Sequence, residues 1–294
     1  MASTNTTKFV NARTALRYTQ VPSQGSLFFV DSVAGASTGG YNPDAPAATL
    51  IQAQTAATAS VGDQVYVKAG HAESITGAAG MTFSKAGVTY IGEGNGRNRP
   101  TITFSTGTDA QMIVSGANVS FRNFVFDFTG IDAIVAAISI TSADVAFEDC
   151  EFITNSGTAG CVLGILTAAT AARLKILRCR FLGPATNTGT TTTAQIKHEV
   201  GVDYVIQDCY FTGKMTQAIL NATALLRGLI DNNRFVIATG TVAITMHASS
   251  TPFISRNVIN VPSGTAPVVA AAGFVAANSY SAAAGVTAGA ALTW

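Results

Sequence analysis

The amino-acid sequence predicts an all-β protein: a single-stranded parallel β-helix of about eight coils with an N-terminal capping helix. The first observation behind this prediction is a six-residue motif, which has an apolar residue first, a polar residue third and an apolar residue last. Successive copies are 26, 29, 30, 24 and 24 residues apart, because they close at Phe126, Phe152, Phe181, Phe211, Phe235 and Ile259. Such spacing is typical of solenoids, in which each repeat forms one coil.

The second observation is the shortness of the apolar runs. They are interrupted by polar corners, whereas a helix would repeat its apolar face about every three to four residues over a longer stretch. A coil built from such short strands cannot bury its own apolar side chains. It therefore needs the coils above and below it.

The third observation is that like residues recur at single motif positions. The fourth position reads Phe124 and then Cys150, Cys179, Cys209, Asn233 and Asn257. Strands of neighbouring coils lie about 4.8 Å apart, so we expect a ladder of cysteines packed as small hydrophobes and asparagines linked by amide hydrogen bonds. The sixth position predicts a second ladder, formed by Phe126, Phe152, Phe181, Phe211 and Phe235. The alternative is that the cysteines share this position by chance. A metal site is disfavoured, because no CxxC pair and no His stands at the spacing of metal ligands.

The N-terminal part of the chain precedes the repeats. Residues 1–27 hold Arg13, Arg17 and Tyr18 and form either a docking arm or a loose end. A strand at 27–31 follows. The run 47–60 then lacks helix breakers and predicts the capping helix, which would cover the open end of the solenoid.

Strands separated by polar corners continue to residue 272. Outside the motif copies we expect strands at 62–70, 81–83, 88–91, 101–104, 134–140, 161–166, 195–198, 218–220, 242–246 and 267–270. Residues 28–272 are therefore predicted to form one β-helix domain. Residues 273–294 are uncharged, and we expect them to form an end cover or a subunit contact rather than a membrane span, which needs about 20 strongly apolar residues.

Composition restricts the classes of function. The chain is 48% hydrophobic and 11% charged, with a formal net charge of +1. We therefore expect no nucleic acid, no membrane and no cofactor among its partners. Residues 1–8 lack the apolar core of a signal peptide, which predicts synthesis in a cytoplasm and free thiols.

Several stretches of the chain resemble a known family. The predicted helix, the pattern Gly-Asp-x-Val-x-Val-x-x-Gly at 62–70, the segment 86–94 and the motif copies are together similar to the right-handed parallel β-helix of the pectate-lyase-like superfamily. The resemblance covers about residues 28–272. The segments 28–31, 41–46, 70–73 and 92–100 resemble tailed-phage virion proteins of this fold. The same solenoid serves lyases, hydrolases and structural proteins, so the fold alone does not give the function.

Enzymes on this scaffold use paired carboxylates, or acidic residues that hold calcium. The candidate carboxylates here are Asp127, Asp132, Asp144, Glu148, Asp149, Glu151, Glu199, Asp203, Asp208 and Asp231. Half of them lie within the motif copies, where each third-position Asp has an Arg one coil away. Such neutralised ladders are typical of a structural role. No nucleophile or metal ligand stands at a recognisable spacing from His71, His198 or His247. We assign no catalytic, cofactor-binding or metal-binding residue.

The function expected from these observations is a non-enzymatic structural component of a bacteriophage virion, made in the host cytoplasm and acting as a capsid decoration or cement protein on the head surface. Its expected partners are further copies of itself in a homotrimer and the phage major capsid protein, which Arg13, Arg17 and Tyr18 would contact. The alternative is a tail spike or fibre that binds, and in one version cleaves, a bacterial surface polysaccharide. A free bacterial lyase or hydrolase is the third hypothesis, and the missing secretory signal disfavours it.

Overall fold

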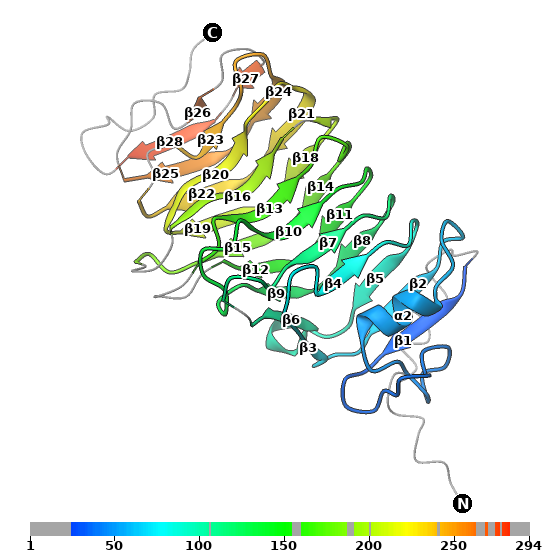
Figure 1. Cartoon of the computed structure of the whole chain (residues 1–294). Coiled ribbons are helices and arrows are strands. Elements are labelled where there is room, and N and C mark those ends of the chain that lie inside the picture. Colours follow the sequence, from blue (N-terminus) through cyan, green and yellow to red (C-terminus); the bar gives the residue numbers. More distant parts are fainter. Residues whose placement is uncertain are drawn as a thin grey trace, which may run out of the picture.

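The chain winds into a parallel β-solenoid in the computed structural model (Figure 1), so the predicted parallel β-helix is confirmed. The structure describes residues 25–105, 107–154, 160–186, 191–199, 201–239, 242–262, 268–269, 274–276 and 278–282. Three sheets run along the solenoid, and every strand pair in them is parallel. The strands β1 and β28 lie at opposite ends (Figure 1).

Sheet 1, as we name it, has 11 strands and contains the first half of each motif copy. Its path along the axis is β1 (Leu27–Val30), β2 (Gln64–Val67), β5 (Thr89–Gly92), β8 (Ser120–Arg122), β11 (Ala146–Glu148), β14 (Lys175–Leu177), β18 (Val205–Gln207), β21 (Leu225–Asp231), β24 (Thr251–Ser255) and β27 (Phe274–Ala276). The short strand β17 (Gly201–Val202) pairs with β21 beside this path.

Sheet 2 has nine strands and contains the second half of each copy: β3 (Ala72–Ile75), β6 (Thr101–Phe104), β9 (Val125–Asp127), β12 (Glu151–Ile153), β15 (Arg180–Leu182), β19 (Tyr210–Gly213), β22 (Arg234–Ile237), β25 (Val258–Val261) and β28 (Ser279–Ala282). Sheet 3 has eight strands: β4 (Met81–Phe83), β7 (Met112–Val114), β10 (Ala136–Ile140), β13 (Leu163–Thr167), β16 (Thr192–His198), β20 (Met215–Asn221), β23 (Ile244–Thr245) and β26 (Val268–Val269). Eight strands in sheet 3 agree with the prediction of about eight coils.

Each motif copy folds as a corner between sheets 1 and 2. Phe147 lies in β11 and Phe152 in β12, with Asp149 and Cys150 forming the corner between them. The third-position residue has a φ between 53° and 62° in all six copies. This is the left-handed region of backbone conformation. After glycine, Asn and Asp adopt it more readily than other residues. The Asn and Asp residues of this column therefore have a conformational role besides their charge.

The capping helix is shorter than predicted. The sequence predicted 47–60, whereas α2 spans Leu50–Ala56. Thr49 begins it with a capping box, in which its side chain accepts from the Gln52 N–H, and the chain turns extended at Ala57. Leu50 and Ala53 are buried, and α2 lies beside β1 and β2 at the N-terminal end (Figure 1). Among the described residues, no helix has the length and apolar character needed to cross a membrane.

The predicted strands are present, with some shifts at their ends. The strands β3 and β7 were not predicted, and β16 and β20 each extend over seven residues. The predicted end of the β-helix at residue 272 is too early, because β27 pairs with β24 and β28 pairs with β25. No charged residue follows Arg256, so nothing in the composition marked the corners of the final coil.

Candidate functional site

The phenylalanines at the sixth motif position form one stack inside the solenoid. The ring centroids of Phe152 and Phe181 are 4.5 Å apart with an interplanar angle of 9°, and those of Phe181 and Phe211 are 4.6 Å apart at 7°. The stack continues to Phe126 at one end and to Phe235 at the other, with centroid distances of 5.2 and 4.9 Å. In-register parallel strands place identical side chains at this spacing, so the rings stack along the axis.

The fourth-position side chains line the same interior, and each cysteine and asparagine among them donates a hydrogen bond to the coil before it. The Sγ of Cys179 donates to the Phe147 carbonyl at 3.4 Å, and the Nδ2 of Asn233 donates to the Ile206 carbonyl at 3.0 Å. Each accepting residue opens the preceding motif copy. The other members follow this rule: Cys150 to Phe121, Cys209 to Ile176 and Asn257 to Ile230. Thiol and amide thus satisfy the same buried backbone carbonyl.

The asparagines also bond to one another along the axis. The Nδ2 of Asn233 donates to Asn257 Oδ1 at 3.0 Å, and the Nδ2 of Asn257 donates to Asn278 Oδ1 at 2.9 Å. Asn278 is a member that the sequence analysis missed. It is the fourth residue of a seventh copy, Val275-Ala-Ala-Asn-Ser-Tyr280, whose third position is Ala instead of Asn, Asp or Arg.

Two of the buried thiols, Cys161 and Cys179, are held protonated. Burial raises the pKa of Cys179 well above its ordinary value, with the neighbouring Cys150 and Cys209 thiols adding to the effect. Burial raises the pKa of Cys161 to about 12. A thiol is neither a nucleophile nor a metal ligand in its protonated form. Within the described ranges, no three His, Cys, Asp or Glu side chains cluster closely enough to hold a metal ion.

Arginines and aspartates of neighbouring coils pair along both edges of sheet 1. Arg178 donates to both carboxylate oxygens of Asp149 at 2.8 and 3.0 Å, and Arg173 donates to both oxygens of Asp144 at 2.6 Å. Two further pairs of this kind are Arg227 with Asp203 and Arg256 with Asp231. Hydrogen bonds from the arginines lower the pKa of Asp144, Asp203 and Asp231.

The pairing departs from the predicted column in two places. Asp208 accepts from Asn232 Nδ2 at 2.6 Å rather than from an arginine. Arg256 pairs with Asp231, which occupies the second motif position and not the third. The arginine one coil before Asp208 is Arg178, which pairs with Asp149, and the residue one coil after Asp208 is Asn232. Arg256 follows Asn232 in the column, so it pairs with Asp231 instead.

All ten carboxylates that the sequence offered as catalytic candidates have a hydrogen-bond or ion-pair partner. Six bond to arginine: Asp144, Glu148, Asp149, Glu151, Asp203 and Asp231. Glu199 pairs with Lys197, and Asp208 with Asn232. Asp127 accepts from Thr129, and Asp132 accepts from the Gly160 N–H. The carboxylates are thus part of the structural hydrogen-bond network.

The three histidines lie in three different environments. His71 is buried, accepts from the Ser32 N–H at Nδ1 and lies 3.2 Å from Glu73 Oε2 through Nε2. Since Glu73 also accepts from the Leu50 N–H, this pair fastens the start of α2 to the first coil. His198 is buried beside Thr167, whereas His247 is exposed and accepts from the Ser249 N–H.

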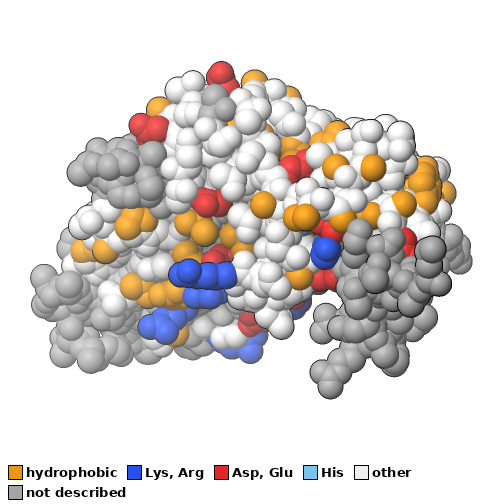
Figure 2. All heavy atoms as spheres, turned by 90° about the horizontal axis from the view of Figure 1, so that it is seen from below, with side chains coloured by type: hydrophobic (Ala, Val, Ile, Leu, Met, Phe, Trp, Pro, Cys, Tyr) orange, Lys and Arg blue, Asp and Glu red, His pale blue; other side chains and the backbone are white. Residues whose placement is uncertain are grey.

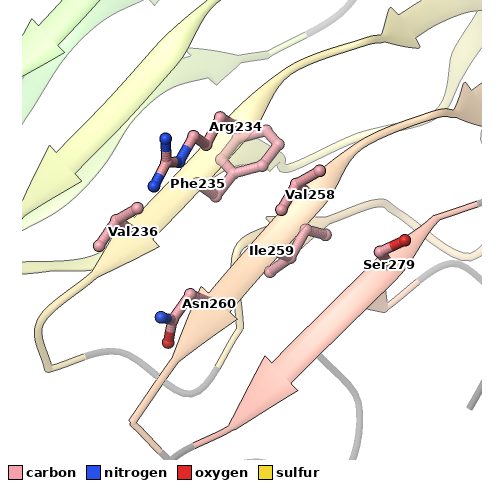
Figure 3. Close-up of a pocket in the computed structure, with 7 residues that line it drawn as sticks. All are labelled: Arg234, Phe235, Val236, Val258, Ile259, Asn260 and Ser279. Atoms are coloured by element: carbon pink, nitrogen blue, oxygen red, sulfur yellow. The ribbon is translucent and has the colours of Figure 1, made fainter. Parts of the chain in front are cut away.

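The outer face of sheet 2 is the candidate binding surface. This sheet lies on the lower side of the solenoid in Figure 1, and Figure 2 shows basic side chains gathered beside apolar ones on that side. A shallow hollow of about 200 Å³ lies across β22, β25 and β28 (Figure 3). Its outward-facing lining is Arg234, Val236, Val258, Asn260 and Ser279, while Phe235 and Ile259 of the same strands are buried in the core. The sequence analysis missed this surface because it did not compare the residues at the fifth motif position along the whole chain.

The predicted docking residues Arg13, Arg17 and Tyr18 lie outside the described residues. The ladder residues are all placed and brought together, as described above. The signal that could have found the sheet-2 surface is the fifth-position column Val125, Glu151, Arg180, Tyr210, Arg234 and Val258.

Comparisons with protein families and with curated protein sequences found no match. Solved structures do match. A rhamnogalacturonan lyase is 16% identical with a TM-score of 0.59, over 80% of this chain and 68% of that one. A pectin methylesterase from carrot is 15% identical with a TM-score of 0.60, over 92% and 87%. The pectate lyase Pel9A is 14% identical with a TM-score of 0.54, over 83% of this chain and 65% of its own, which is under two thirds of its length. The chain has the parallel β-helix fold of pectate-lyase-like proteins.

Proposed function

We propose that this chain is a non-enzymatic structural component of a bacteriophage virion, which decorates the surface of the capsid. The observation that carries the non-enzymatic part is the engagement of all ten candidate carboxylates in ion pairs or hydrogen bonds. A general acid needs a carboxyl whose pKa lies near the working pH. Arginine lowers the pKa of Asp144, Asp203 and Asp231 instead, so these groups hold no proton to donate.

The phage part of the proposal is supported by the sequence. The segments 28–31, 41–46, 70–73 and 92–100 resemble tailed-phage virion proteins of this fold. The cross-coil ladders make a stiff rod, which suits a part that must hold its shape on a particle. In this proposal the protein forms a homotrimer, and residues 1–24 with Arg13, Arg17 and Tyr18 dock on the major capsid protein.

Antibody labelling of phage particles, viewed by electron microscopy, tests the location. We expect label spread over the heads. Label confined to tail tips, or absent from particles, would overturn the decoration role. A second experiment uses protein lacking residues 1–24, which should lose binding to the particle while keeping its melting temperature. Undiminished binding by the shortened protein would remove the arm from the proposal.

The competing function is a tail spike that cleaves surface polysaccharide. The names of the structural relatives make it the alternative, although at 14–16% identity they establish the fold alone. A screen of acidic and neutral polysaccharides for released reducing ends or unsaturated sugars distinguishes the two. We expect no release, and turnover that is lost in a carboxylate variant such as Glu151→Gln would replace the structural proposal with the enzymatic one.

A further inference from the structure

The three sheets of the solenoid differ in the charge that their strands carry. The strands of sheet 3 contain a single Asp, Glu, Lys or Arg residue, Lys197, and it is paired with Glu199. The strands of sheet 1 contain Arg122, Glu148, Lys175, Arg227 and Asp231. Those of sheet 2 contain Glu73, Asp127, Glu151, Arg180 and Arg234. Sheet 3 is therefore the least charged side of the molecule.

One row of outward-facing side chains runs along sheet 3 from β7 to β26, whose strands follow one another along the solenoid (Figure 1). The parallel register aligns in this row Ile113, Ser139, Leu166, Lys197, Leu220, Thr245 and Val269. The residues that precede the four central members, Ile138, Ile165, Ile196 and Ile219, are buried in the core, so the row itself points outward.

The middle of this face is apolar. Leu166 and Leu220 are half-buried and pack on Leu163, in an apolar cluster that is separate from the main core. Depletion of charge around apolar side chains is typical of the centre of a subunit interface. The outer face of sheet 3 thus has the composition that a contact with another protein surface needs.

The distribution of charge favours a second copy of this chain as the partner. Around a three-fold axis parallel to the solenoid, the same residue of each copy lies at the same height. A charged residue on the inward-facing side would therefore meet two like charges and repel them. Sheets 1 and 2 would incur this repulsion at several coils, whereas sheet 3 would incur it only at Lys197, where Glu199 offsets it.

The area of the face is sufficient for such a contact. Eight strands spaced about 4.8 Å apart give a length of about 34 Å. The central strands β10, β13, β16 and β20 are five to seven residues long, which gives a width of about 16–23 Å. The resulting flat area, roughly 500–800 Å², approaches the ~800 Å² that each partner contributes to a stable interface.

We propose that the outer face of sheet 3 is the subunit interface of the homotrimer, in which three copies pack side by side around an axis parallel to the solenoid. This inference rests on the homotrimer of the proposed function and adds the surface through which it forms. The charged outer faces of sheets 1 and 2 then point away from the axis.

One coil provides a matched set of variants for the test. Leu177 on β14, Leu182 on β15 and Leu166 on β13 are half-buried leucines on sheets 1, 2 and 3, and the first two follow the core residues Ile176 and Phe181. Sedimentation equilibrium of the full chain measures the concentration at which half of the protein is assembled. We expect a trimer for the natural protein and for Leu177→Glu and Leu182→Glu.

Leu166→Glu places three carboxylates around the axis and should raise that concentration at least about tenfold. Leu166→Gln has nearly the same volume without the charge, and should raise it less. Ser139→Asp lies in the same row outside the apolar cluster, so it repeats the test without disturbing Leu163. Melting temperatures confirm that each variant folds.

Two kinds of result would overturn the proposal, and they are distinguishable. A monomeric natural protein would remove both the homotrimer and this interface, while the virion role is judged separately by the labelling of particles. A trimer that forms equally well in Leu166→Glu and Ser139→Asp would remove the interface alone. Loss of that trimer in Leu177→Glu or Leu182→Glu would then place the contact on sheet 1 or sheet 2.

Discussion

The solenoid buries two columns of polar side chains. The side chains of one column have hydrogen-bond partners for nearly all of their polar atoms, whereas those of the other column do not. In the first column, at the corner between sheets 1 and 2, Asn257 donates to a backbone carbonyl and to the next amide, and accepts from the coil before it. The second column runs along the ends of β13, β16 and β20 as Thr167, His198 and Asn221. There, within the described part of the chain, His198 Nε2 and Asn221 Oδ1 are buried without a hydrogen-bond partner.

The difference lies in what the backbone needs at each place. At the motif corner the left-handed residue turns the chain out of the sheet ladder, so a carbonyl and an N–H are left for a side chain to satisfy. An amide has one donor and one acceptor group in the right places. At the end of sheet 3 the backbone is paired by the neighbouring strands, and the polar side chains must find partners among themselves. A polar column is therefore stable when it replaces missing backbone bonds.

The stacked phenylalanines beside these polar columns give the largest expected effect on the free energy of unfolding. Phe181→Ala should lower the free energy of unfolding by about 3–5 kcal/mol, because it removes a ring stacked on both faces and leaves a cavity. Denaturant titration monitored by far-ultraviolet circular dichroism measures it. Tyr41→Ala, which truncates a ring that is 65% exposed, is the control and should cost far less. An unchanged stability in Phe181→Ala would show that the register is wrong.

Acidification tests the incompletely paired column. Burial lowers the pKa of His198 from 6.5 to about 4. Between these pH values His198 is protonated in the unfolded chain and neutral in the folded chain. The free energy of unfolding should therefore fall by about 3 kcal/mol as the pH drops from about 6.5 to about 4. Above this window the contribution is constant. Urea titrations across the window measure the loss.

His198→Gln is the control for the acid effect, since it removes the titrating ring and should flatten the stability profile between those pH values. The paired aspartates do not interfere, because their pKa values are lowered from 3.8 and their contribution is lost only below the window. A slope that persists unchanged in His198→Gln would assign the acid sensitivity to another group.

Removing one amide from the completely paired column comes next in size. Asn257→Ala leaves the Asn233 N–H and the Ile230 carbonyl without partners, and should cost about 2–3 kcal/mol. Asn221→Ala removes an amide whose Oδ1 already lacks a partner, and should cost about 1 kcal/mol less. Equal losses, measured by thermal and denaturant unfolding, would mean that side-chain volume and not pairing decides the stability of both columns.

This comparison also explains how far the sequence could predict the molecule. The Phe, Cys and Asn columns repeat because each coil sets the same requirement, so spacing alone was enough to place them in register. Asn278 was not predicted because its motif copy has Ala at the third position. The strands β3 and β7 were not predicted because they are only four and three residues long and lie outside the motif. The His198 column reads Thr, His, Asn and follows no repeat, so only the structure brings it together. The fifth-position column of Arg180, Tyr210 and Arg234 was readable in the sequence, whereas the pairing of Glu151 with Arg99, 52 residues away, is visible only in the structure.

The smallest expected effect tests the boundary between thiols and amides within the first column. Cys209 donates through Sγ to the Ile176 carbonyl at 3.4 Å, and its N–H already donates to Asn233 Oδ1 at 2.9 Å. In Cys209→Asn the new amide can donate to the same carbonyl and to Asn233, which extends the amide chain by one coil, so we expect stability within about 1 kcal/mol of the natural protein.

The reverse change is not symmetric with this one. Asn233→Cys leaves the Cys209 N–H without its acceptor and should cost about 1–3 kcal/mol in denaturant titration. If instead Cys209→Asn costs as much as Asn233→Cys, the boundary would be set by the space between the coils, since an amide is bulkier than a thiol. The asymmetry thus separates hydrogen-bond register from packing as the reason why the column changes from cysteine to asparagine where it does.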